Sequence, residues 1–491
     1  MKDSIPVKRS EPSARAVGFL DTTIDARDDA AHLVDGAGLL WDRMMLSAAP
    51  AAAVRPPSMA VPAELRFVLR LFDAAADGST TGGPSVPSAG ARYPYEHYAV
   101  VVGLAGPAVY AVDAIRRGCR LVRTGPQVVR ALERSGLRVP MAGESLVLTV
   151  VRPWLSMSKY GNRGYLYAQL DAAHLTAHLY CLAAGSHVST ELRTRMPTAP
   201  LSELLELNAN CRFVHSVLVL GGPRHAGAGP DIAWTCADDR GNSQDRRAAP
   251  WLETECWKWL TAHRATGPVL PAADDGRLRH LLVDAPLWEA DPAPDGATLG
   301  AAAARRRSAK DFTPAPLYGP ALDRALVALR TPLSIDLPPS TGLSATLIAR
   351  RVTDRTPGSH PLFRGGSSSS PMAPAPEDEE LVRACMGQEH LRHAAALVLF
   401  HVPRQELLRG GGRAIDEALL RAGTLAHLLY LGAAAAEVDV TAIGGFDASR
   451  WSSLAGLPAR HEVLYVVLLG PSGKSTVKID RLHPAYAHNE R

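Results

Sequence analysis

One short segment pairs two side chains that could carry out proton chemistry. Lys159 and Tyr160 stand side by side, just before a long apolar stretch. Both have a high intrinsic pKa, and burial beside another cation could make either one a general base near neutral pH. The alternative is a surface loop with aromatic side chains packed beneath it, and the pattern alone leaves both interpretations open.

A second segment gathers four cations and a hydroxyl within residues 305–310. The alternate side chains of Arg306, Ser308 and Lys310 could converge on a phosphate, because arginine supplies a planar fork of donors and serine a short one. Arg481, near the C-terminus, could add a phosphate contact or remain a solvated charge. The alternative for the whole segment is a solvated basic turn, which charge alone favours.

Two turns of small residues could bring backbone amides close to a planar ligand. The first is Pro-Ser-Ala-Gly at residues 87–90, and the second is the pair Gly444 and Gly445, which could offer an amide to a ring nitrogen. For each turn taken alone, an ordinary chain reversal is the simpler interpretation.

His174 and His178 are four residues apart, a spacing that places both on one face of a helix and can bind a metal. No third histidine, glutamate or cysteine is obviously paired with them. We therefore expect hydrogen-bonded polar residues near a pocket here, and no metal site.

The chain repeats itself at a spacing near 250 residues. Pro-Ser-Thr-Gly at 339–342 repeats the core of the first turn 252 positions later. Residues 175–184 match 425–434 at an offset of 250, and residues 217–221 match 466–470 at an offset of 249. Each match is weak alone, but three in one order at nearly one offset indicate two copies of one fold.

The composition suits two ordinary domains. A chain of 491 residues, 46% of them apolar, is too long for one core. The net charge of +4 gives little support to a nucleic-acid role. The six cysteines form no Cys-x-x-Cys pair, which predicts free thiols in the cytoplasm. Residues 1–9 lack the apolar core of a signal peptide. The sequence contains no run of about 18 apolar residues, so we expect no membrane span.

Periodicity predicts the elements that position these motifs. A helix is expected over residues 64–75, a central apolar helix over 166–184 and its counterpart over 419–436. Residues 28–45 could form an amphipathic helix. β-Branched and apolar runs predict strands over residues 98–104, 146–151, 216–220 and 461–469.

These elements predict an α+β fold in four parts. An N-terminal extension covers residues 1–60, a first domain 61–223, a connector 224–297 and a second domain 298–491. The connector holds five tryptophans and should pack on the domains. The Pro/Gly/Ser-rich residues 354–380 predict a mobile loop. The Gly-x-Gly-x-x-Gly fingerprint is missing, so a doubly wound nucleotide-binding sheet is not supported.

The segments "PSAGARYPYEHY", "SKYGNRGYLYAQLDAAHLTAHLY", "RRRSAKDF" and "AGTLAHLLYLGAAAAEVDVTAIGGFD" resemble the nitroreductase-like flavoproteins. More narrowly, they resemble the branch that dehydrogenates azolines in ribosomally made peptides, of the streptolysin and microcin type and of thiopeptide pathways. The resemblance covers residues 60–222 and 298–485. Its most discriminating piece is Lys-Tyr-Gly-x-Arg-x-Tyr, whereas Arg-x-Ser-x-Lys-x-Phe is typical of the wider superfamily. It implies tandem α/β/α sandwich domains.

Proteins of this kind bind FMN at a dimer interface, where one subunit supplies the Arg-x-Ser segment and its partner the Pro-Ser-x-Gly turn. In this chain each copy keeps a complementary half. The first copy has the turn and the Lys-Tyr pair but no Arg-x-Ser, and the second has Arg-x-Ser but no Arg-Tyr-Pro after its turn. The resemblance therefore implies an internal pseudo-dimer with one intact flavin site and one lost site.

The resemblance also assigns roles to the candidate residues. Lys159 and Tyr160 match the catalytic pair. The Arg-x-Ser segment would hold the phosphate and ribityl chain, the first turn would border the flavin, and the glycine pair would lie near its N5 edge. This cofactor-binding set comprises Arg306, Ser308, Lys310, Arg481, Ser88, Ala89, Gly90, Arg92, Gly444 and Gly445.

By the same resemblance, the chain is an oxidase that converts thiazolines or oxazolines in a modified precursor peptide to thiazoles or oxazoles, with a cyclodehydratase as partner. Lys159 or Tyr160 would take a proton from the former Cα, and flavin would take a hydride from the former Cβ. Two alternatives remain. One is a generic NAD(P)H-dependent FMN nitroreductase for small molecules, and the other is a non-catalytic scaffold in a peptide-modifying complex.

Overall fold

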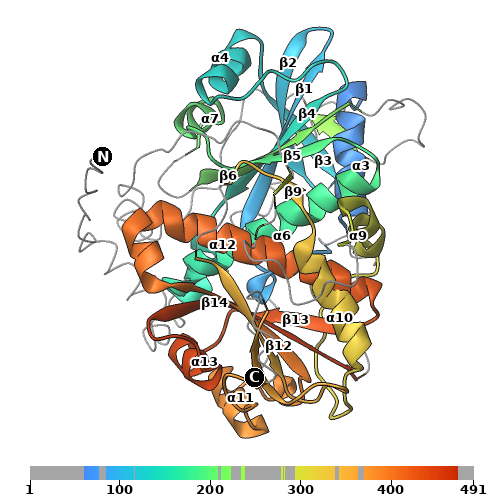
Figure 1. Cartoon of the computed structure of the whole chain (residues 1–491). Helices are drawn as coiled ribbons and strands as arrows, with labels where there is room; N and C mark the ends of the chain where they lie inside the picture. The colour runs from blue at the N-terminus through green and yellow to red at the C-terminus, as the bar shows by residue number, and fades with distance from the viewer. Residues whose placement is uncertain are drawn as a thin grey trace, which may run out of the picture.

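The computed structural model describes residues 60–76, 85–114, 117–207, 212–222, 234–237, 278–279, 281, 293–337, 342–362 and 370–473. They form two α/β halves, the first in the upper part of Figure 1 and the second in the lower part, with two long helices between them. The possible helix over residues 28–45, the turn residues 339–341 and Arg481 lie outside the described residues.

The first half is built on a seven-stranded sheet with the order β5-β6-β4-β1-β2-β3-β7. All neighbours are antiparallel except β3 and β7, which are parallel. The strands are β1 (Tyr95–Gly103), β2 (Gly106–Asp113), β3 (Gly118–Thr124), β4 (Ser145–Val151), β5 (Thr190–Arg193), β6 (Phe213–Leu220) and β7 (Thr235–Ala237). The helices include α3 (Arg66–Ala74), α4 (Pro126–Arg134), α5 (Trp154–Tyr160), α6 (Arg163–Gly185) and α7 (Ala199–Leu204).

The second half is built on a five-stranded antiparallel sheet with the order β11-β10-β12-β14-β13. The strands are β10 (Ser344–Ala349), β11 (Gly358–Pro361), β12 (Ala396–Pro403), β13 (Asp439–Ile443) and β14 (His461–Gly470). The helices include α9 (Gly296–Ala303), α10 (Gly319–Val327), α11 (Asp378–Ala384), α12 (Arg404–Ala435) and α13 (Ala448–Leu454). A two-stranded ladder joins β8 (Leu278–Arg279) to β9 (Leu333–Ser334).

The two sheets match strand for strand. The order β5-β6-β4-β1-β2 corresponds to β13-β14-β12-β10-β11, with corresponding strands about 250 residues apart. The equivalent pairs β4–β6 and β12–β14 also shift register at the same place, after Thr149 in β4 and after Phe400 in β12. A β-bulge at the same position in both sheets shows that the two halves share a backbone path and not only a similar composition. The fold therefore confirms the tandem α+β architecture predicted from three short sequence matches.

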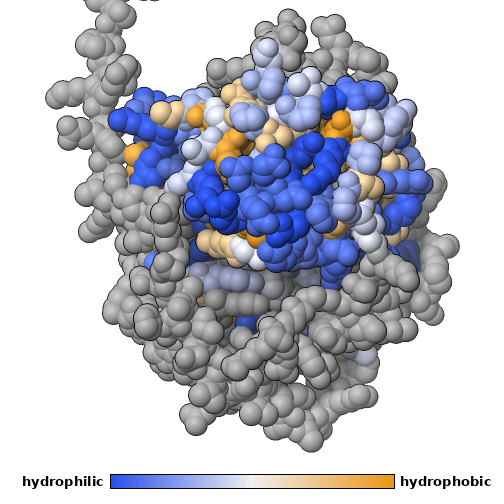
Figure 2. Space-filling model, turned by 90° about the horizontal axis from the view of Figure 1, so that it is seen from below, coloured by the Kyte–Doolittle hydropathy of each residue, from blue (hydrophilic) through white to orange (hydrophobic). Residues whose placement is uncertain are grey.

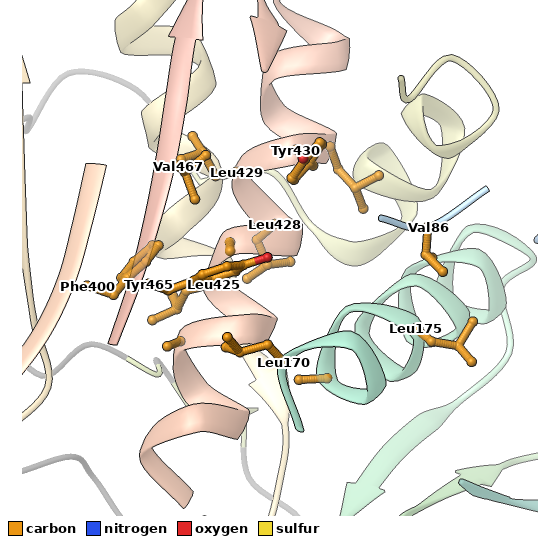
Figure 3. Packing of buried hydrophobic residues seen from close by; sticks show 14 of the residues in the cluster. Val86, Leu170, Leu175, Phe400, Leu425, Leu428, Leu429, Tyr430, Tyr465 and Val467 are labelled. Atoms are coloured by element: carbon orange, nitrogen blue, oxygen red, sulfur yellow. The ribbon is translucent and has the colours of Figure 1, made fainter. Parts of the chain in front are cut away.

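The two central helices form the contact between the halves. α6 is buried over most of its circumference and packs on α12 and on α9 (Figure 1). α12 includes Gly412–Ala435, which is long and apolar enough to cross a membrane, but 89% of its most apolar window is buried inside the protein. That burial is typical of a core helix. Figure 3 shows Leu170 of α6 near Leu425 of α12.

Most apolar side chains in the described part of the second half lie in the core, whereas Tyr318, Met372 and Met386 are exposed. Figure 2 shows the end of the molecule that carries α11 and α13, where hydrophilic residues dominate the coloured surface and hydrophobic ones form small, separate spots. The first turn of α11 is acidic, and Glu377 and Glu380 close it with a reciprocal capping box.

Two elements differ from their sequence-based predictions. α12 begins at Arg404 rather than at residue 419, because tertiary packing carries the helix through the consecutive glycines 410–412 that weaken it locally. Residues 354–380 are not entirely a loop, since they contain β11 and the start of α11. The described part of the connector pairs with both halves: β7 extends the first sheet, and β8 pairs with β9 of the second half. Trp234 also donates a hydrogen bond to Asp73 of the first half at 3.0 Å.

Candidate active site

Five polar residues of α6 lie on one face of a largely apolar helix. Their spacings of three or four residues place them in one stripe along the helix. All five are buried, and none is more than 8% exposed. Burying a polar side chain is unfavourable unless it is hydrogen-bonded. We therefore take this stripe as the candidate site. The members of this α6 stripe are Arg163, Tyr167, Asp171, His174 and His178.

The first end of the α6 stripe closes on the glycine turn of the second half. Tyr167 Oη donates to the Gly444 carbonyl at 2.7 Å, and Arg163 Nε lies 3.2 Å from the same oxygen. A Cβ atom on Gly444 would lie 2.3 Å from the Tyr167 ring, so only glycine fits there. At Gly445 a Cβ atom would meet nothing closer than 3.3 Å, the amide nitrogen of Gln388. Tight packing on Tyr167 therefore explains the first glycine of the pair but not the second.

The middle of the α6 stripe holds the Pro-Ser-Ala-Gly turn. Ser88 Oγ donates to Asp171 at 2.6 Å, and the Ala89 amide donates to the same carboxylate at 3.1 Å. Ser88 Oγ also accepts from the amide of Tyr93 at 2.9 Å. Gly90 has φ 57°, in the left-handed region that glycine adopts without a steric penalty. Burial raises the pKa of Asp171 to about 7, and the hydrogen bonds from Ser88 and Ala89 oppose that rise.

The predicted catalytic pair ends α5, directly before α6. The Tyr160 ring lies edge-on to that of Tyr167, with centroids 4.9 Å apart. Burial raises the pKa of Tyr160, Tyr167 adds to the shift, and the cation of Arg92 opposes it. Tyr160 therefore stays protonated at neutral pH and is suited to donating a hydrogen bond rather than to acting as a base. Arg92 itself is buried, and burial lowers its pKa.

The far end of the α6 stripe meets a third histidine, His427 of α12. His174 Nδ1 lies 3.2 Å from His427 Nδ1, and His178 Nδ1 lies 3.0 Å from His427 Nε2. Burial lowers the pKa of His174 and of His178 to about 3, and lowers the pKa of His427 well below its usual range. Arg306 contributes to all three shifts. Its guanidinium lies over the Tyr430 ring, whose centroid is 5.7 Å from that of His174. The two histidines are thus hydrogen-bonded polar residues, as expected.

The predicted phosphate segment lies at this end. Arg306 is 2% exposed and donates from Nη1 to Ser308 Oγ at 3.3 Å. Its guanidinium lies 5.4 Å from the centre of the Tyr430 ring, and Ser308 Oγ is 3.3 Å from Tyr430 Oη. The amide of Ala442 donates to that phenol oxygen at 2.7 Å. A buried guanidinium beside hydroxyl groups is suited to a phosphate. Lys310 is half-buried in the same segment.

The structure brings three predicted segments against one helix face. The Pro-Ser-Ala-Gly turn meets Asp171, the glycine turn meets Tyr167, and Arg306 lies beside the histidines. We call this contact, lined by α6 and by residues of both halves, the first seam. Asp171, Tyr167 and His427 were not singled out from the sequence. Polar residues at helical spacing within an apolar helix are the signal that could have identified the first two.

The first seam fits the FMN implied by the sequence resemblance. Arg306 and Ser308 supply the donors that a phosphate needs. The Tyr95 hydroxyl is buried with no hydrogen-bond partner within the described part of the chain, and Asp171 is close enough to raise its pKa further beyond the effects of burial and Tyr93. A ligand with polar ring edges could use this hydroxyl.

Comparisons with known proteins agree with this architecture. Residues 303–471 match the model of the Nitroreductase family. No curated protein gives a significant match. A putative nitroreductase from Anabaena variabilis has a similar structure, with a TM-score of 0.62 at 17% identity, covering 94% of this chain and 99% of that one. The likeness therefore spans both halves, and at this identity it shows the fold alone.

Two further solved structures resemble part of the chain. The Escherichia coli microcin synthetase McbBCD has a TM-score of 0.29 at 17% identity, covering 36% of this chain and 73% of that one. The NADPH:FMN oxidoreductase of Vibrio harveyi has a TM-score of 0.24 at 19% identity, covering 36% and 70%. At these TM-scores the two partial likenesses support no statement about function. Residues 303–471 thus form a nitroreductase-family domain, and the nitroreductase fold extends across both halves of the chain.

Proposed function

We propose that this protein is an FMN-dependent oxidase that converts thiazolines or oxazolines of a modified precursor peptide to thiazoles or oxazoles, as in thiopeptide pathways. One observation carries the proposal. The segments that resemble azoline dehydrogenases, far apart in the sequence and drawn from both halves, meet the single α6 stripe. The Lys-Tyr-Gly-x-Arg-x-Tyr segment, which distinguishes this branch within the resemblance, leads directly into that stripe.

The residues of the first seam would hold the cofactor from two sides. Arg306, Ser308 and Lys310 would bind the phosphate, with Arg481 as an additional contact. The turn around Ser88, including Ala89, Gly90 and Arg92, would border the ring system from the first half, and Gly444 and Gly445 from the second. When bound, the flavin supplies the acceptor for a hydride from the substrate.

The chain itself must remove a proton from the azoline ring. The raised pKa of Tyr160 makes its phenolate scarce at neutral pH, so we assign the base to Lys159 and a hydrogen-bonding role to Tyr160. Loss of the proton and a hydride leaves an aromatic azole, which drives the reaction forward. An azoline substrate also implies a preceding cyclodehydration, so a cyclodehydratase is the proposed partner.

Substitution of the predicted base tests this proposal. Lys159→Ala should keep its yellow flavin but lose azoline oxidation by about 100-fold or more, because general base catalysis contributes on that order. Tyr160→Phe, which keeps the ring, is the matched variant and should lose less. Mass spectrometry of an azoline peptide follows the loss of two hydrogens. Full turnover by Lys159→Ala would remove the proposed base.

A generic NAD(P)H-dependent nitroreductase is the second candidate, because the family model that matches residues 303–471 is that of the nitroreductases. It predicts rapid bleaching of the flavin by NAD(P)H alone, whereas a peptide oxidase would show little bleaching. Stopped-flow absorbance with NADH, NADPH and an azoline peptide in parallel separates the two functions.

A further inference from the structure

A hydrogen-bonded chain of five buried side chains crosses from one half to the other. Ser85 Oγ lies 2.9 Å from His178 Nε2, and His178 Nδ1 lies 3.0 Å from His427 Nε2. His427 Nδ1 lies 3.2 Å from His174 Nδ1, and His174 Nε2 lies 2.9 Å from Tyr465 Oη. The segment before β1, α6, α12 and β14 all contribute. Each ring nitrogen of the three histidines lies within hydrogen-bonding distance of another of these five side chains.

We propose that these five side chains form a proton relay between Tyr465, beside the candidate active site, and Ser85. The catalytic role that we assign to this relay rests on the proposed function, whereas the hydrogen bonds that form the relay do not depend on it. Figure 3 shows Tyr465 reaching from β14 to α12, near Leu425. His174 follows Asp171 by three residues on α6, so the Tyr465 end of the relay lies next to the carboxylate that holds the Pro-Ser-Ala-Gly turn.

Neutral imidazole chemistry allows the four contacts to be made in only two ways. Each ring carries one N–H and one lone pair, so each must donate on one side and accept on the other. In the first pattern Tyr465 donates, and the protons sit on His174 Nδ1, His427 Nε2 and His178 Nε2. In the second pattern Ser85 donates, and the protons sit on His178 Nδ1, His427 Nδ1 and His174 Nε2. Transfer of one proton along the chain converts one pattern into the other.

The environment keeps the relay neutral at rest. Burial is the first cause of the lowered pKa of each histidine, and the charge of Arg306 adds to it. Asp171 and Tyr167 of α6 and Tyr430 of α12 are the other titratable groups near the relay. Burial raises the pKa of Tyr465, with Tyr430, Asp171 and Tyr167 adding to the shift, so this phenol also stays neutral.

An excess proton moving along the relay would pass through His427. A protonated His427 would donate to both neighbouring rings, and these would donate outward to Tyr465 and Ser85. After the proton leaves at the opposite end, no net charge remains and every ring holds the other tautomer. Rings packed in a core do not readily turn over, so the next proton must travel in the reverse direction.

This alternation matches the chemistry of a peptide oxidase. Azoline dehydrogenation leaves one proton on the protein in the first half of a cycle. Return of the two electrons to dioxygen, with formation of hydrogen peroxide, takes up one proton in the second half. One transfer in each direction per turnover would restore the relay.

Histidine tautomers test the relay without flavin or substrate. In full-length protein labelled with ¹⁵N-histidine, long-range ¹⁵N–¹H spectra report which nitrogen of each ring carries the proton. We expect His174, His427 and His178 to follow one of the two patterns, or an exchange average of both. Any other combination in the unsubstituted protein would overturn the relay.

Substitutions at the two ends sharpen the test, because neither one touches His427. Tyr465→Phe should place the His427 proton on Nε2, since a bare ring lone pair at His174 costs less than a buried orphan N–H. Ser85→Ala should place it on Nδ1 by the same argument at the other end. Thr176→Val is the control, because its hydroxyl lies on α6 outside the relay and bonds the Ala172 carbonyl. The same His427 tautomer in both end variants would overturn the proposal.

A kinetic measurement separates failure of the relay from failure of the proposed function. With an azoline peptide, both end variants should keep their flavin, lose about tenfold in turnover and change the solvent deuterium isotope effect. Unchanged turnover and isotope effect in both variants would contradict the relay. Absence of azoline turnover in the unsubstituted protein would instead contradict the function, and the tautomer patterns would still decide the relay.

Discussion

The two seams that the duplication creates differ in what fills them. After β13 the first seam has Gly444 and Gly445, whereas at the equivalent place after β5 the first half has Thr194 and Arg195. The amides of Thr194 and Arg195 donate to the carboxylate of Asp336 at 2.9 Å each. We call this contact the second seam. Side chains and ion pairs occupy it where the first seam keeps glycines.

The two seams also differ in the charged side chains at their centres. The positions of α12 that correspond to Tyr167 and Asp171 hold Glu417 and Arg421. Burial lowers the pKa of Arg421 to about 10, with Glu417 opposing the shift. Glu417 Oε1 accepts from Arg195 Nε at 2.9 Å and from Arg413 Nε at 3.0 Å. A network of this kind satisfies its own charges, so we infer that only the first seam accepts a planar, anionic ligand.

The strongest way to break this comparison is to fill the glycine turn. Gly444→Ala places a Cβ atom 2.3 Å from the Tyr167 ring. We expect at least tenfold weaker flavin binding and a loss of about 3 kcal/mol in the free energy of unfolding, from overpacking. Thr194→Ala at the equivalent position should keep the flavin. Retention of full flavin content in Gly444→Ala would show that the turn does not shape the site.

Opening the second seam should affect stability alone. Glu417→Gln leaves Arg195, Arg413 and Arg421 without their shared carboxylate, and we expect the free energy of unfolding to fall by about 2 kcal/mol. Denaturant titration measures the loss, and the visible spectrum should be unchanged. Loss of flavin from a folded Glu417→Gln protein would indicate that the flavin binds in the second seam rather than in the first.

The histidines make the first seam acid-sensitive. A group whose pKa is lowered on folding contributes stability that is present above its unfolded pKa and lost as pH falls towards its folded pKa. For His174, stability should therefore fall between pH 6.5 and about 3, by about 1.4 kcal/mol per pH unit. The corresponding residue of α12 is Thr424, which does not titrate.

Urea unfolding at several pH values checks this slope. In His174→Gln the free energy of unfolding should depend less steeply on pH, by the equivalent of about one bound proton, whatever its stability at pH 7. Thr424→Val should leave the slope unchanged. An identical slope in His174→Gln and the unsubstituted protein would mean that His174 is charged in the folded state.

The sequence predicted the fold well because the duplication preserved regular features. Apolar periodicity located α6, apolar and β-branched runs located β1, β4, β6 and β14, and the repeated offset indicated two copies of one fold. The beginning of α12 was missed, because local propensity at three glycines gave no sign of the packing that carries the helix through them. The motif segments were found from their residue types. Their meeting on Asp171, Tyr167 and His427 could not be predicted, because it depends on contacts between residues far apart in the sequence.

Flavin stoichiometry tests the central claim most directly. The purified full-length protein would be denatured, and the released cofactor identified by mass and quantified by its visible absorbance against protein concentration. The account predicts FMN at one equivalent per chain, bound in the first seam. Two equivalents per chain, or a folded protein that binds no flavin when supplied with it, would contradict the account.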